Sequence, residues 1–507
     1  MTDTPDADDG QVENLPEQMR VRLEKRQAIL ALGDNPYEVD TRPTHGIADL
    51  RGRYGHLNAD EQSGDTVTVV GRVIFVRVTG KLCFAKLRDG DGSEVQAMFS
   101  LAVLGEQRLA DLKALVDLGD ILGVTGEVIS SRRGELSVQA TSWEMVSKAL
   151  RPLPVAHRPL SVQARVRQRY VDLIVRPEAR RMVRHRASIT ESVRATLKRH
   201  GYLEVETPTL GLIHGGAAKP FVSHFNALDS TVYLRTNLEL ALKRAVVGGV
   251  HKVYEIGRVF RNEGLDSTHS AEFTELEAYE ALGDLRTMAA LIRDLVIDSA
   301  EVTNGAVVPD GHGGEIDLAA EWTWLPIHDA VSNAVQQEVT VDTDAGTLRA
   351  FADDRGVHVQ SGWSAGDIVL ELFEKLVEHT LLRPTFVCDY PADVRPLARP
   401  KPGEPRLAEA FDLIAAGTEL APAYSELADP VIQRQRFLEQ AAAAAAGDVE
   451  AMELDEDFLR ALEYGMPPAG GMGMGLDRLI MLLTGVRSLR ETILFPAVRP
   501  ESQGSPE

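Results

Sequence analysis

The stretch from about Thr66 to Val146 constrains the fold more strongly than any other part of this 507-residue chain. It contains five short runs of β-branched or alternating residues, among them TVTVVGRVIFVRV, EVQAMFS and GELSVQATSWEMV, and such runs are typical of strands. A helical pattern, LAVLGEQRLADLKALVDLG, lies between the third run and the fourth. Five strands with a helix at that point indicate an OB-type barrel, although strand count alone leaves another small barrel open.

The remainder of the chain divides around this barrel. An amphipathic helical pattern runs from Leu15 to about Leu32, where Gly33 ends it. Beyond the proline-rich RPLPVAHRPL, helical runs alternate with strands such as KVYEIGRVF, and a helical insertion is expected at about 283–382. We therefore predict an α+β chain with four segments: a tail and helix at 1–60, the barrel at 61–148, a linker at 149–165 and a larger helix–strand domain at 166–500.

Charge limits the partners that the chain can have. The net charge is −22, so a nucleic-acid partner would need a local basic patch rather than a basic surface everywhere. Residues 151–199 contain 13 Lys or Arg and 3 Asp or Glu, and a second basic cluster comprises Arg20, Arg22, Lys25 and Arg26. Each cluster is either a solvated helix face or a contact for phosphates, and charge counts alone leave both interpretations open.

Several common classes of protein are not indicated. Cys83 and Cys388 lie far apart without zinc-type spacing, and they form no disulfide framework. The acidic start MTDTPDADDG does not resemble a signal peptide. No apolar run approaches the length that a membrane helix needs. We expect a cytoplasmic protein with no membrane segment.

The segment RVFRNEGLDSTHSAEF at 258–273 is the first candidate for chemistry. Arg261 and Glu263 follow an alternating strand, and residues i and i+2 of a strand share a face. An antiparallel hairpin would bring His269 and Phe273 near Arg261, which gives a cation for phosphate or carboxylate oxygens and a ring for stacking on a base. Taken alone, Arg-x-Glu is more often part of a surface hairpin with ion pairs.

Two further elements are weak by themselves. In GGMGMGLDRLIMLLTG, the alternating Gly471, Gly473 and Gly475 share one strand face, and a helix carrying Arg478 follows. Glycines there allow a ligand or another backbone to approach closely, and an arginine near a helix start can meet a phosphate. The third element, LKRHGYLEVETPTL at 197–210, combines a helix end with a short strand and is consistent with ordinary core packing.

Together, and in this order, the three elements resemble motifs 1, 2 and 3 of the class II aminoacyl-tRNA synthetases. The resemblance implies an ATP site on an antiparallel sheet flanked by helices, and a homodimer formed through motif 1. A preceding OB barrel narrows the likeness to the subclass for Asp, Asn and Lys. KALRPLP, RVRQRYVDLI, GGAAKPF, LKRAVVGG and PAYSEL look like bacterial lysyl-tRNA synthetases, over about residues 15–500.

That resemblance implies roles for individual residues. Arg261, Glu263 and Arg478 would be catalytic. ATP would be bound by Arg261, Glu263, His269, Phe273, Asp412, Glu419 and Arg478. Two of these carboxylates, Asp412 and Glu419, would hold Mg²⁺ on the phosphates, since hard oxygen ligands suit that ion.

The remaining implied sites concern the amino acid and the tRNA. A buried ammonium needs carboxylates beside it, because an unpaired buried charge is very costly. L-lysine would be bound by Gly215, Gly216, Glu239, Arg261, Glu277, Tyr279, Tyr424 and Glu426. The anticodon of tRNA(Lys) would contact Phe84, Gln96 and Glu135 of the barrel. For Phe84, simple core packing is an equally good interpretation.

The chain also departs from the family pattern around the amino acid. It has Thr236-Asn237-Leu238 where Ala-Pro is usual before Glu239, and Arg395 where a serine precedes Pro-Leu-Ala-Arg. Pro422 stands where an asparagine often binds the substrate carboxylate, and a proline side chain cannot donate that bond. Two alternatives to a lysine–tRNA ligase remain. One is a divergent paralogue that adenylates a lysine analogue or another acceptor, or that confers resistance to an inhibitor; the other is a catalytically silent tRNA-binding protein.

Overall fold

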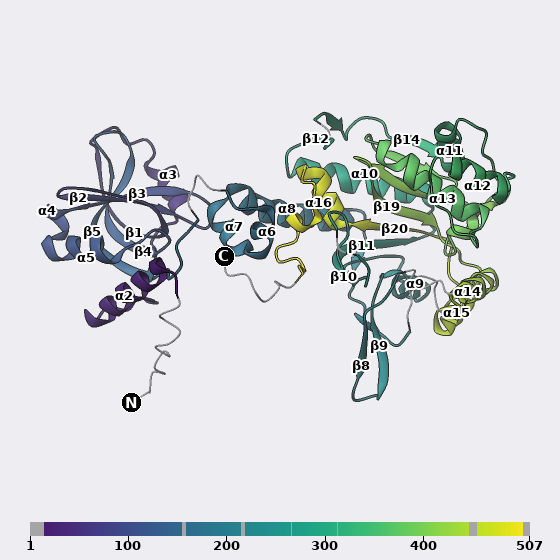
Figure 1. Ribbon diagram of the computed structural model, residues 1–507, viewed down its shortest axis with the longest axis horizontal. Helices are drawn as coiled ribbons and strands as arrows, with labels where there is room; N and C mark the ends of the chain where they lie inside the picture. Colours follow the sequence, from purple (N-terminus) through teal and green to yellow (C-terminus); the bar gives the residue numbers. More distant parts are fainter. Residues whose placement is uncertain are drawn as a thin grey trace. The chain divides into compact units, whose positions relative to one another are not determined.

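The structure is a computed structural model that describes residues 15–154, 159–213, 218–264, 266–311, 313–445 and 454–499 (Figure 1). The chain forms two compact units, residues 1–180 and 181–507. Among the described residues, no helix is both long and apolar enough to cross a bilayer.

The first unit contains a closed five-stranded barrel with the strand order β1-β2-β3-β5-β4. Its strands are β1 (Gln62–Thr79), β2 (Leu82–Arg88), β3 (Glu94–Ser100), β4 (Ile121–Ser130) and β5 (Leu136–Ser147). Two helices, α4 (Leu101–Leu104) and α5 (Glu106–Leu115), separate the third strand from the fourth, as the sequence pattern predicted. Only β3 and β5 pair in parallel, and their pairing closes the barrel. The predicted OB fold is thereby confirmed.

The helix α2 (Glu17–Ala31) packs on the barrel through residues that looked like a basic surface patch. Arg22 is buried and donates hydrogen bonds to the carbonyls of Leu118 and Ala149, each at 2.9 Å, and Lys25 pairs with Asp117 at 2.7 Å. Both residues are therefore structural, and the interpretation of this cluster as a solvated face or a phosphate contact is wrong for them.

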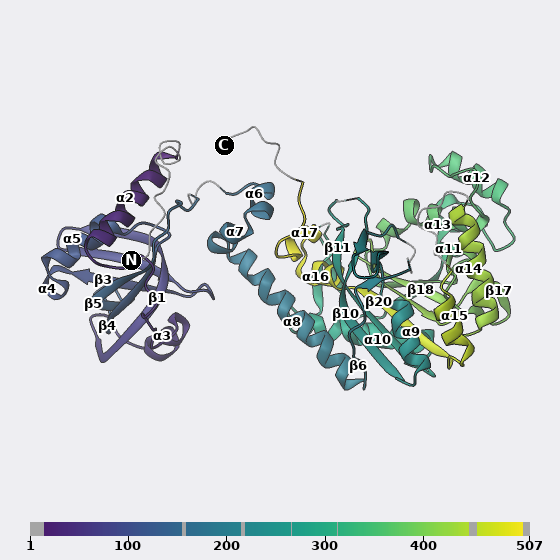
Figure 2. The same cartoon turned by 90° about the horizontal axis from the view of Figure 1, so that it is seen from below.

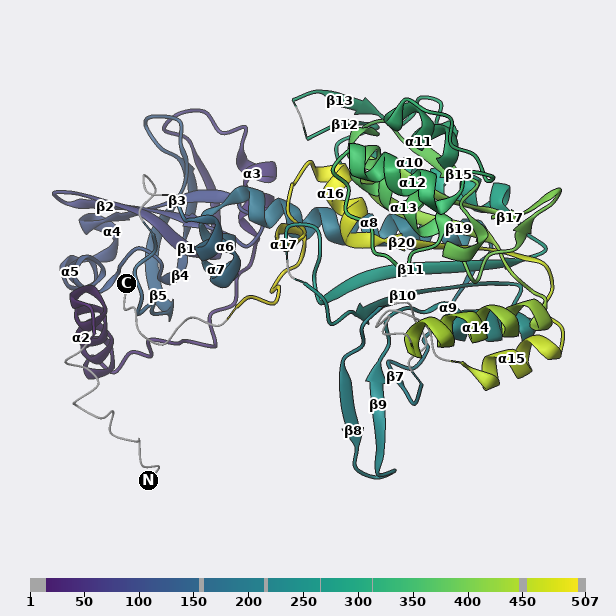
Figure 3. The ribbon, with the colours of Figure 1, turned by 45° about the vertical axis from the view of Figure 1, so that its right-hand side comes forward.

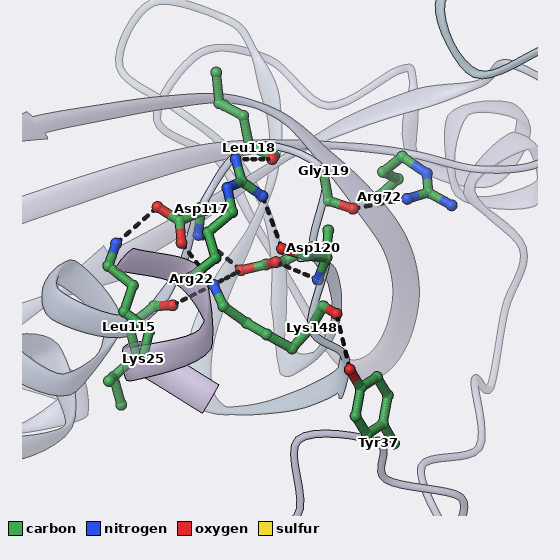
Figure 4. Close-up of polar contacts among 11 residues, drawn as sticks. Arg22, Lys25, Tyr37, Arg72, Leu115, Asp117, Leu118, Gly119, Asp120 and Lys148 are labelled. Carbon is green, nitrogen blue, oxygen red and sulfur yellow. Dashed lines mark hydrogen bonds and ion pairs between the residues drawn. The ribbon is translucent and has the colours of Figure 1, made fainter. Parts of the chain in front are cut away.

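A fully buried lysine lies at the centre of these contacts (Figure 4). Lys148 Nζ is 2.7 Å from Asp117 and 2.8 Å from Asp120, and it also donates to the carbonyl of Leu115 at 2.7 Å. Burial of an ammonium is tolerable only with such a complete set of acceptors. The network joins α5, the start of β4 and the end of β5 to α2. Three more helices lie beyond the barrel: α3 (Ile47–Tyr54) precedes it, and α6 (Val162–Arg167) and α7 (Arg169–Val175) follow it.

The second unit is built on an eight-stranded sheet with the order β14-β15-β18-β19-β20-β11-β10-β6. These strands are β6 (Leu203–Glu204), β10 (Lys252–Phe260), β11 (Glu272–Ala281), β14 (Thr323–Pro326), β15 (Thr385–Cys388), β18 (Ala410–Ala415), β19 (Thr418–Ser425) and β20 (Ala469–Gly475). Six neighbouring strands, from β15 through β10, pair antiparallel throughout, and each end of the sheet adds a parallel strand. The predicted antiparallel sheet flanked by helices is confirmed, with these parallel edges added.

The two faces of the sheet carry different helices (Figure 3). Leu276 and Ala278 of β11 belong to the apolar core that includes α8 (Pro177–Arg199), α10 (Leu285–Glu301) and α16 (Leu476–Thr484). Figure 2 shows α8 as the long helix that leads into β6. The alternate residue Tyr279 packs on the other face with α9 (Glu239–Val247), α14 (Pro430–Ala445) and α15 (Glu456–Glu463). Glu275 and Glu277 share the strand face of Tyr279.

Smaller elements complete the unit. The helices α11 (Ile327–Val335), α12 (Ala345–Asp354) and α13 (Ala365–Leu376) form an apolar cluster that also includes Val387 and Ile414 of the sheet. A three-stranded sheet of β7 (Leu210–Gly211), β9 (Ser230–Leu234) and β8 (Val222–Phe225) and two short hairpins, β12–β13 (Val307–Pro309 and Glu315–Asp317) and β16–β17 (Pro400–Lys401 and Glu404–Ala408), lie outside the main sheet. The short helix α17 (Leu489–Thr492) comes last.

Candidate adenylation site

A cavity of about 410 Å³ opens on the face of the sheet that carries Glu275. Eight of the residues that the sequence singled out line it: Arg261, Glu263, His269, Phe273, Asp412, Glu419, Tyr424 and Arg478. They come from β11, β18, β19 and α16 and from the loop between β10 and β11, so the fold brings together segments that are far apart in the chain.

The β10–β11 hairpin places Arg261 as predicted. The two strands pair antiparallel, and the backbone N–H of Arg261 donates to the carbonyl of Ala271 at 3.0 Å. The Arg261 guanidinium carbon lies 5.1 Å from the centre of the Phe273 ring, and its Nη2 lies 3.8 Å from Glu275 Oε1. The guanidinium thus remains partly exposed to the cavity, with an aromatic ring beside it and one carboxylate at long range.

The connecting loop holds the next two residues. His269 Nδ1 lies 2.8 Å from Asp266 Oδ2, and its backbone N–H donates to the same carboxylate at 2.7 Å. These bonds fix one edge of the imidazole and leave the ring at the wall of the cavity. Glu263 lines the same wall.

The glycine-rich strand β20 runs between β11 and β19, and the helix α16 follows it directly. Arg478, in the first turn of α16, donates from Nη1 to the backbone carbonyl of Glu419 at 2.8 Å and lies 3.6 Å from its carboxylate. The neighbouring Asp477 is buried: it accepts a bond from the backbone N–H of Thr274 at 2.8 Å and pairs with Arg186 of α8. Asp477 was not assigned a role from the sequence, and it ties the start of α16 to β11.

Gly471 is required because the side chains of Tyr279 in β11 and of Glu426, just after β19, approach it. A Cβ built there would lie 2.0 Å from Glu426 Oε1 and 2.5 Å from Cε1 of Tyr279. Tyr279 and Tyr424 are its partners in the adjacent strands. The alternating glycines therefore make room for polar groups on the cavity face of the sheet, as their spacing suggested.

Behind the cavity lies a buried group of carboxylates. Glu277 accepts hydrogen bonds from the Tyr279 hydroxyl at 2.7 Å and from the backbone N–H of Leu238 at 2.9 Å. Glu426 is 2.5 Å from the fully buried Lys243 Nζ, which also lies 2.6 Å from Glu239. Lys243 was missed in the sequence. Its spacing of four residues from Glu239 on one helix is the signal that could have revealed it.

The carboxylates in this region outnumber the buried cations. Lys243 lies between Glu239 and Glu426, whereas Glu277 has only neutral donors within hydrogen-bond range. Burial raises the pKa of Glu277 well above its usual range, and the nearby Glu275 and Glu239 raise it further. Burial likewise raises the pKa of Glu275 to about 7, although the Arg261 charge opposes the shift. A bound cation would offset this excess of negative charge.

Asp412 and Glu419 can both face a metal ion. Asp412 Oδ2 accepts a bond from Arg395 Nη2 at 2.5 Å, while its buried Oδ1 has no hydrogen-bond partner among the described residues. The Glu419 side chain is 42% exposed. One oxygen of Asp412 and the carboxylate of Glu419 suit a hard divalent ion such as Mg²⁺, which takes its other ligands from water and phosphate. The sequence indicates Arg395 only as a departure from the family pattern near the amino acid. Its pairing with Asp412 is visible only in the structure.

The other five residues with an implied role are two glycines and three residues of the barrel. Gly215 and Gly216 fall outside the described residues. In the barrel, the Phe84 ring stacks under Arg77 at 5.1 Å, and Gln96 Nε2 donates to the Ser137 hydroxyl at 2.8 Å. The third barrel residue, Glu135, has its Oε1 atom 3.4 Å from Nη2 of Arg51. All three side chains are accessible rather than part of the barrel core.

The fold and the site define the class of this chain. Residues 161–499 match the model of the family "tRNA synthetases class II (D, K and N)", and residues 67–146 match that of the "OB-fold nucleic acid binding domain". The chain belongs to the class II tRNA synthetases of this subclass.

Full-length relatives carry the comparison further. The chain is 53% identical to the lysine–tRNA ligase of Mycolicibacterium gilvum, over 98% of this chain and 99% of that protein. It is 52% identical to the lysine–tRNA ligase of Kineococcus radiotolerans, with the same coverage. A third relative, the lysylphosphatidylglycerol biosynthesis bifunctional protein LysX of Mycobacterium marinum, is 47% identical over 98% of this chain but only 44% of that longer protein.

Proposed function

We propose that this chain activates L-lysine with ATP and transfers it to tRNA(Lys). The observation that carries this proposal is the position of Glu277: a buried carboxylate that has no cationic partner among the described residues, on the same strand face as the cavity residue Glu275. Glu277 favours a substrate with a positively charged side chain, and Arg261 and Arg478, which line the cavity, favour its carboxylate and the phosphates of a nucleotide. The identities of 53% and 52% to lysine–tRNA ligases support the same conclusion.

In the first step, a carboxylate oxygen of lysine attacks the α-phosphorus of ATP, and the bond to the bridging oxygen breaks to release pyrophosphate. Arg261 aligns the carboxylate and the α-phosphate, and Arg478 stabilises the charge that develops on the leaving group. Phe273 stacks on adenine, and Glu263 and His269 hold the nucleotide. Asp412 and Glu419 would hold a Mg²⁺ ion, which would supply further neutralisation of phosphate charge. No covalent bond to the protein forms.

In the second step, a hydroxyl at the 3′ end of the tRNA attacks the carbonyl carbon of the lysyl-adenylate, and AMP leaves. The barrel provides the contact with the anticodon through Phe84, Gln96 and Glu135. An accessible aromatic ring beside an arginine is suited to stacking on an unpaired base. The Phe84 ring under Arg77 has this arrangement.

We further propose that the enzyme is a cytoplasmic homodimer. The small sheet β7-β9-β8 and its flanking turns expose an unusual number of apolar side chains: Leu210, Leu212, Val222, Phe225 and Leu228. The β8–β9 hairpin projects from the second unit (Figure 3). Exposed apolar clusters of this kind favour a protein interface, and this one lies next to the motif 1 segment.

A divergent paralogue that adenylates a lysine analogue is the second candidate. Pro422 lines the cavity, so the hydrogen bond that an asparagine would donate at this position is absent. A catalytically silent protein is a weaker candidate, because Arg261, Glu263, Glu419 and Arg478 all line one cavity.

Exchange of pyrophosphate into ATP, measured with a panel of amino acids and followed by charging of purified tRNA, tests the proposal. Lysine should support the fastest exchange, and Arg261→Ala should abolish it. Arg258→Ala is the matched control, because Arg258 lies on the same hairpin, is 42% exposed, and pairs with no carboxylate among the described residues except Glu272, at 3.6 Å. Unchanged exchange in Arg261→Ala would contradict the mechanism. Exchange without tRNA charging would favour the paralogue, and no exchange with any amino acid would favour the silent protein.

A further inference from the structure

We propose that Arg395 is a substrate-binding residue, whose guanidinium binds the carboxylate of the amino acid opposite Arg261. This inference rests on the proposed lysine activation and adds a residue to it. Arg395 follows the short helix η2 (Ala392–Val394) and lines the cavity together with Asp412 and Tyr424.

The surroundings hold Arg395 in a fixed orientation. Its Nη2 lies 2.5 Å from Asp412 Oδ2, and its guanidinium carbon lies 4.2 Å from the centre of the fully buried Tyr390 ring. A carboxylate on one edge and an aromatic ring on one face restrict the side chain to a small range of rotamers. The cation is therefore already in place before any substrate arrives.

Arg395 also has hydrogen-bonding capacity that the protein does not use. A guanidinium carries five N–H donors. The described residues accept only two of them: Asp412 takes one, and the carbonyl of Val394 takes another at the long distance of 3.5 Å. Nε is buried and has no hydrogen-bond partner among the described residues. A buried donor left in this state is costly, and a planar pair of anionic oxygens would satisfy it.

Asp412, which pairs with Arg395, and Glu277 lie at the two ends of one row of residues across the sheet. Asp412 is the β18 partner of Pro422 in β19, and a Cβ at Gly473 in β20 would lie 3.7 Å from Pro422 and 3.8 Å from Glu277 in β11. These four residues form one row across four strands. Because strands lie about 4.8 Å apart, the row spans roughly 14 Å from Asp412 to Glu277. A ligand whose ammonium meets Glu277 can reach Arg395 with its carboxylate only if several carbon atoms separate the two groups.

The row also explains why the anion is a carboxylate rather than a phosphate. The proline at position 422, in the middle of the row, has no side-chain donor for a carboxylate. Arg395 supplies such donors beside the adjacent strand, where it is bound to Asp412, the β18 partner of Pro422. The Arg395 charge acts on Tyr424, which lines the same cavity and to which the resemblance assigns lysine binding. Phosphate contacts are already available from Arg261 and Arg478.

Binding of three ligands to the full-length protein, measured by calorimetry, tests this assignment. L-lysine carries the carboxylate, L-lysinamide replaces it with a neutral amide, and ATP carries phosphates only. We expect Arg395→Gln to weaken lysine binding on the order of 10- to 100-fold, as expected for a lost charge-assisted bond, with lysinamide and ATP within about twofold of wild type. Arg399→Gln is the matched control, since Arg399 pairs with Glu409 and does not line the cavity.

Each alternative result has a definite meaning. Equal losses for lysine and lysinamide, or no loss for lysine, would overturn the assignment, and a loss confined to ATP would assign Arg395 to phosphate. If Arg395→Gln does not fold, Arg395→Lys keeps the charge without the planar fork and should weaken lysine alone, by a smaller factor. Failure of the wild-type protein to bind lysine would contradict the proposed function itself and not the role of Arg395.

Discussion

Burial makes ionisation of Glu275 and Glu277 unfavourable, and a bound cation can offset this unfavourable free energy. Burial raises the pKa of Glu275 to about 7 and that of Glu277 well above its usual range, so both hold protons that they would lose in water near neutral pH. An ammonium favours the ionised carboxylates, and its binding therefore releases protons. Because the competing protons become scarcer as pH rises, the affinity for lysine should increase with pH through this range.

We therefore predict that the Kd for lysine falls between pH 6 and pH 8, by up to about tenfold per pH unit for each proton released. Calorimetry at a series of pH values measures the trend, and the dependence of the enthalpy on buffer ionisation counts the protons. Norleucine is the matched ligand, because it lacks the ε-ammonium and its binding should not follow the same trend. A lysine affinity that is flat, or that falls with rising pH, would contradict the model of unpaired carboxylates.

Some residues of the candidate site were predictable from the sequence, and others were not. Arg261 and Phe273 were predictable, because one hairpin between two recognisable strands brings them together. The pairs Lys243–Glu426 and Arg395–Asp412 were not, because the two members of each pair lie in segments that are far apart in the chain or on different elements. Only the spacing of Lys243 from Glu239 on one helix is a local signal. A charge pair across distant segments leaves no local pattern, and its members look like ordinary solvated residues.

At the level of elements, β20 depends on the absence of a side chain at Gly471. We predict that Gly471→Ala destabilises the protein by about 1–3 kcal/mol, because the new methyl group overlaps Glu426 and Tyr279 in an already packed region. Gly473→Ala is the comparison variant: its methyl group would lie 3.7 Å from Pro422 and 3.8 Å from Glu277, which is ordinary van der Waals contact. Denaturant unfolding measures both, and equal stability of the two variants would contradict the packing argument.

Most helices and strands were predictable from the sequence. Which side of a helix packs against the rest of the protein was less predictable. The barrel strands and the helix α13 follow from periodicity, because burial of one face imposes a repeat on the sequence. For α2, the helix was predicted correctly and its basic side was misassigned. Arg22 and Lys25 turn toward acceptors near the loop before β4, and no periodicity of α2 itself encodes the position of that loop.

On the scale of the whole molecule, the chain has two compact units, and the proposed function assigns a different activity to each. Under the proposed function, adenylate formation would need only the cavity of the second unit, whereas selection of the tRNA would require the barrel of the first. A change confined to the barrel should therefore affect one of the two steps and leave the other intact. Phe84 is suited to this test because its ring is accessible and is stacked under Arg77.

We predict that Phe84→Ala raises KM for tRNA(Lys) in the charging reaction by an amount corresponding to about 1–3 kcal/mol, the usual value of one stacked base, while lysine-dependent pyrophosphate exchange stays at the wild-type rate. Leu118→Ala, in the same unit and 45% exposed, is the control that should change neither activity. A fall in exchange would mean that the substitution disturbs the catalytic unit. Unchanged charging would mean that the ring only packs against the barrel, because a base that stacks on Phe84 must lose that contact when the ring is removed.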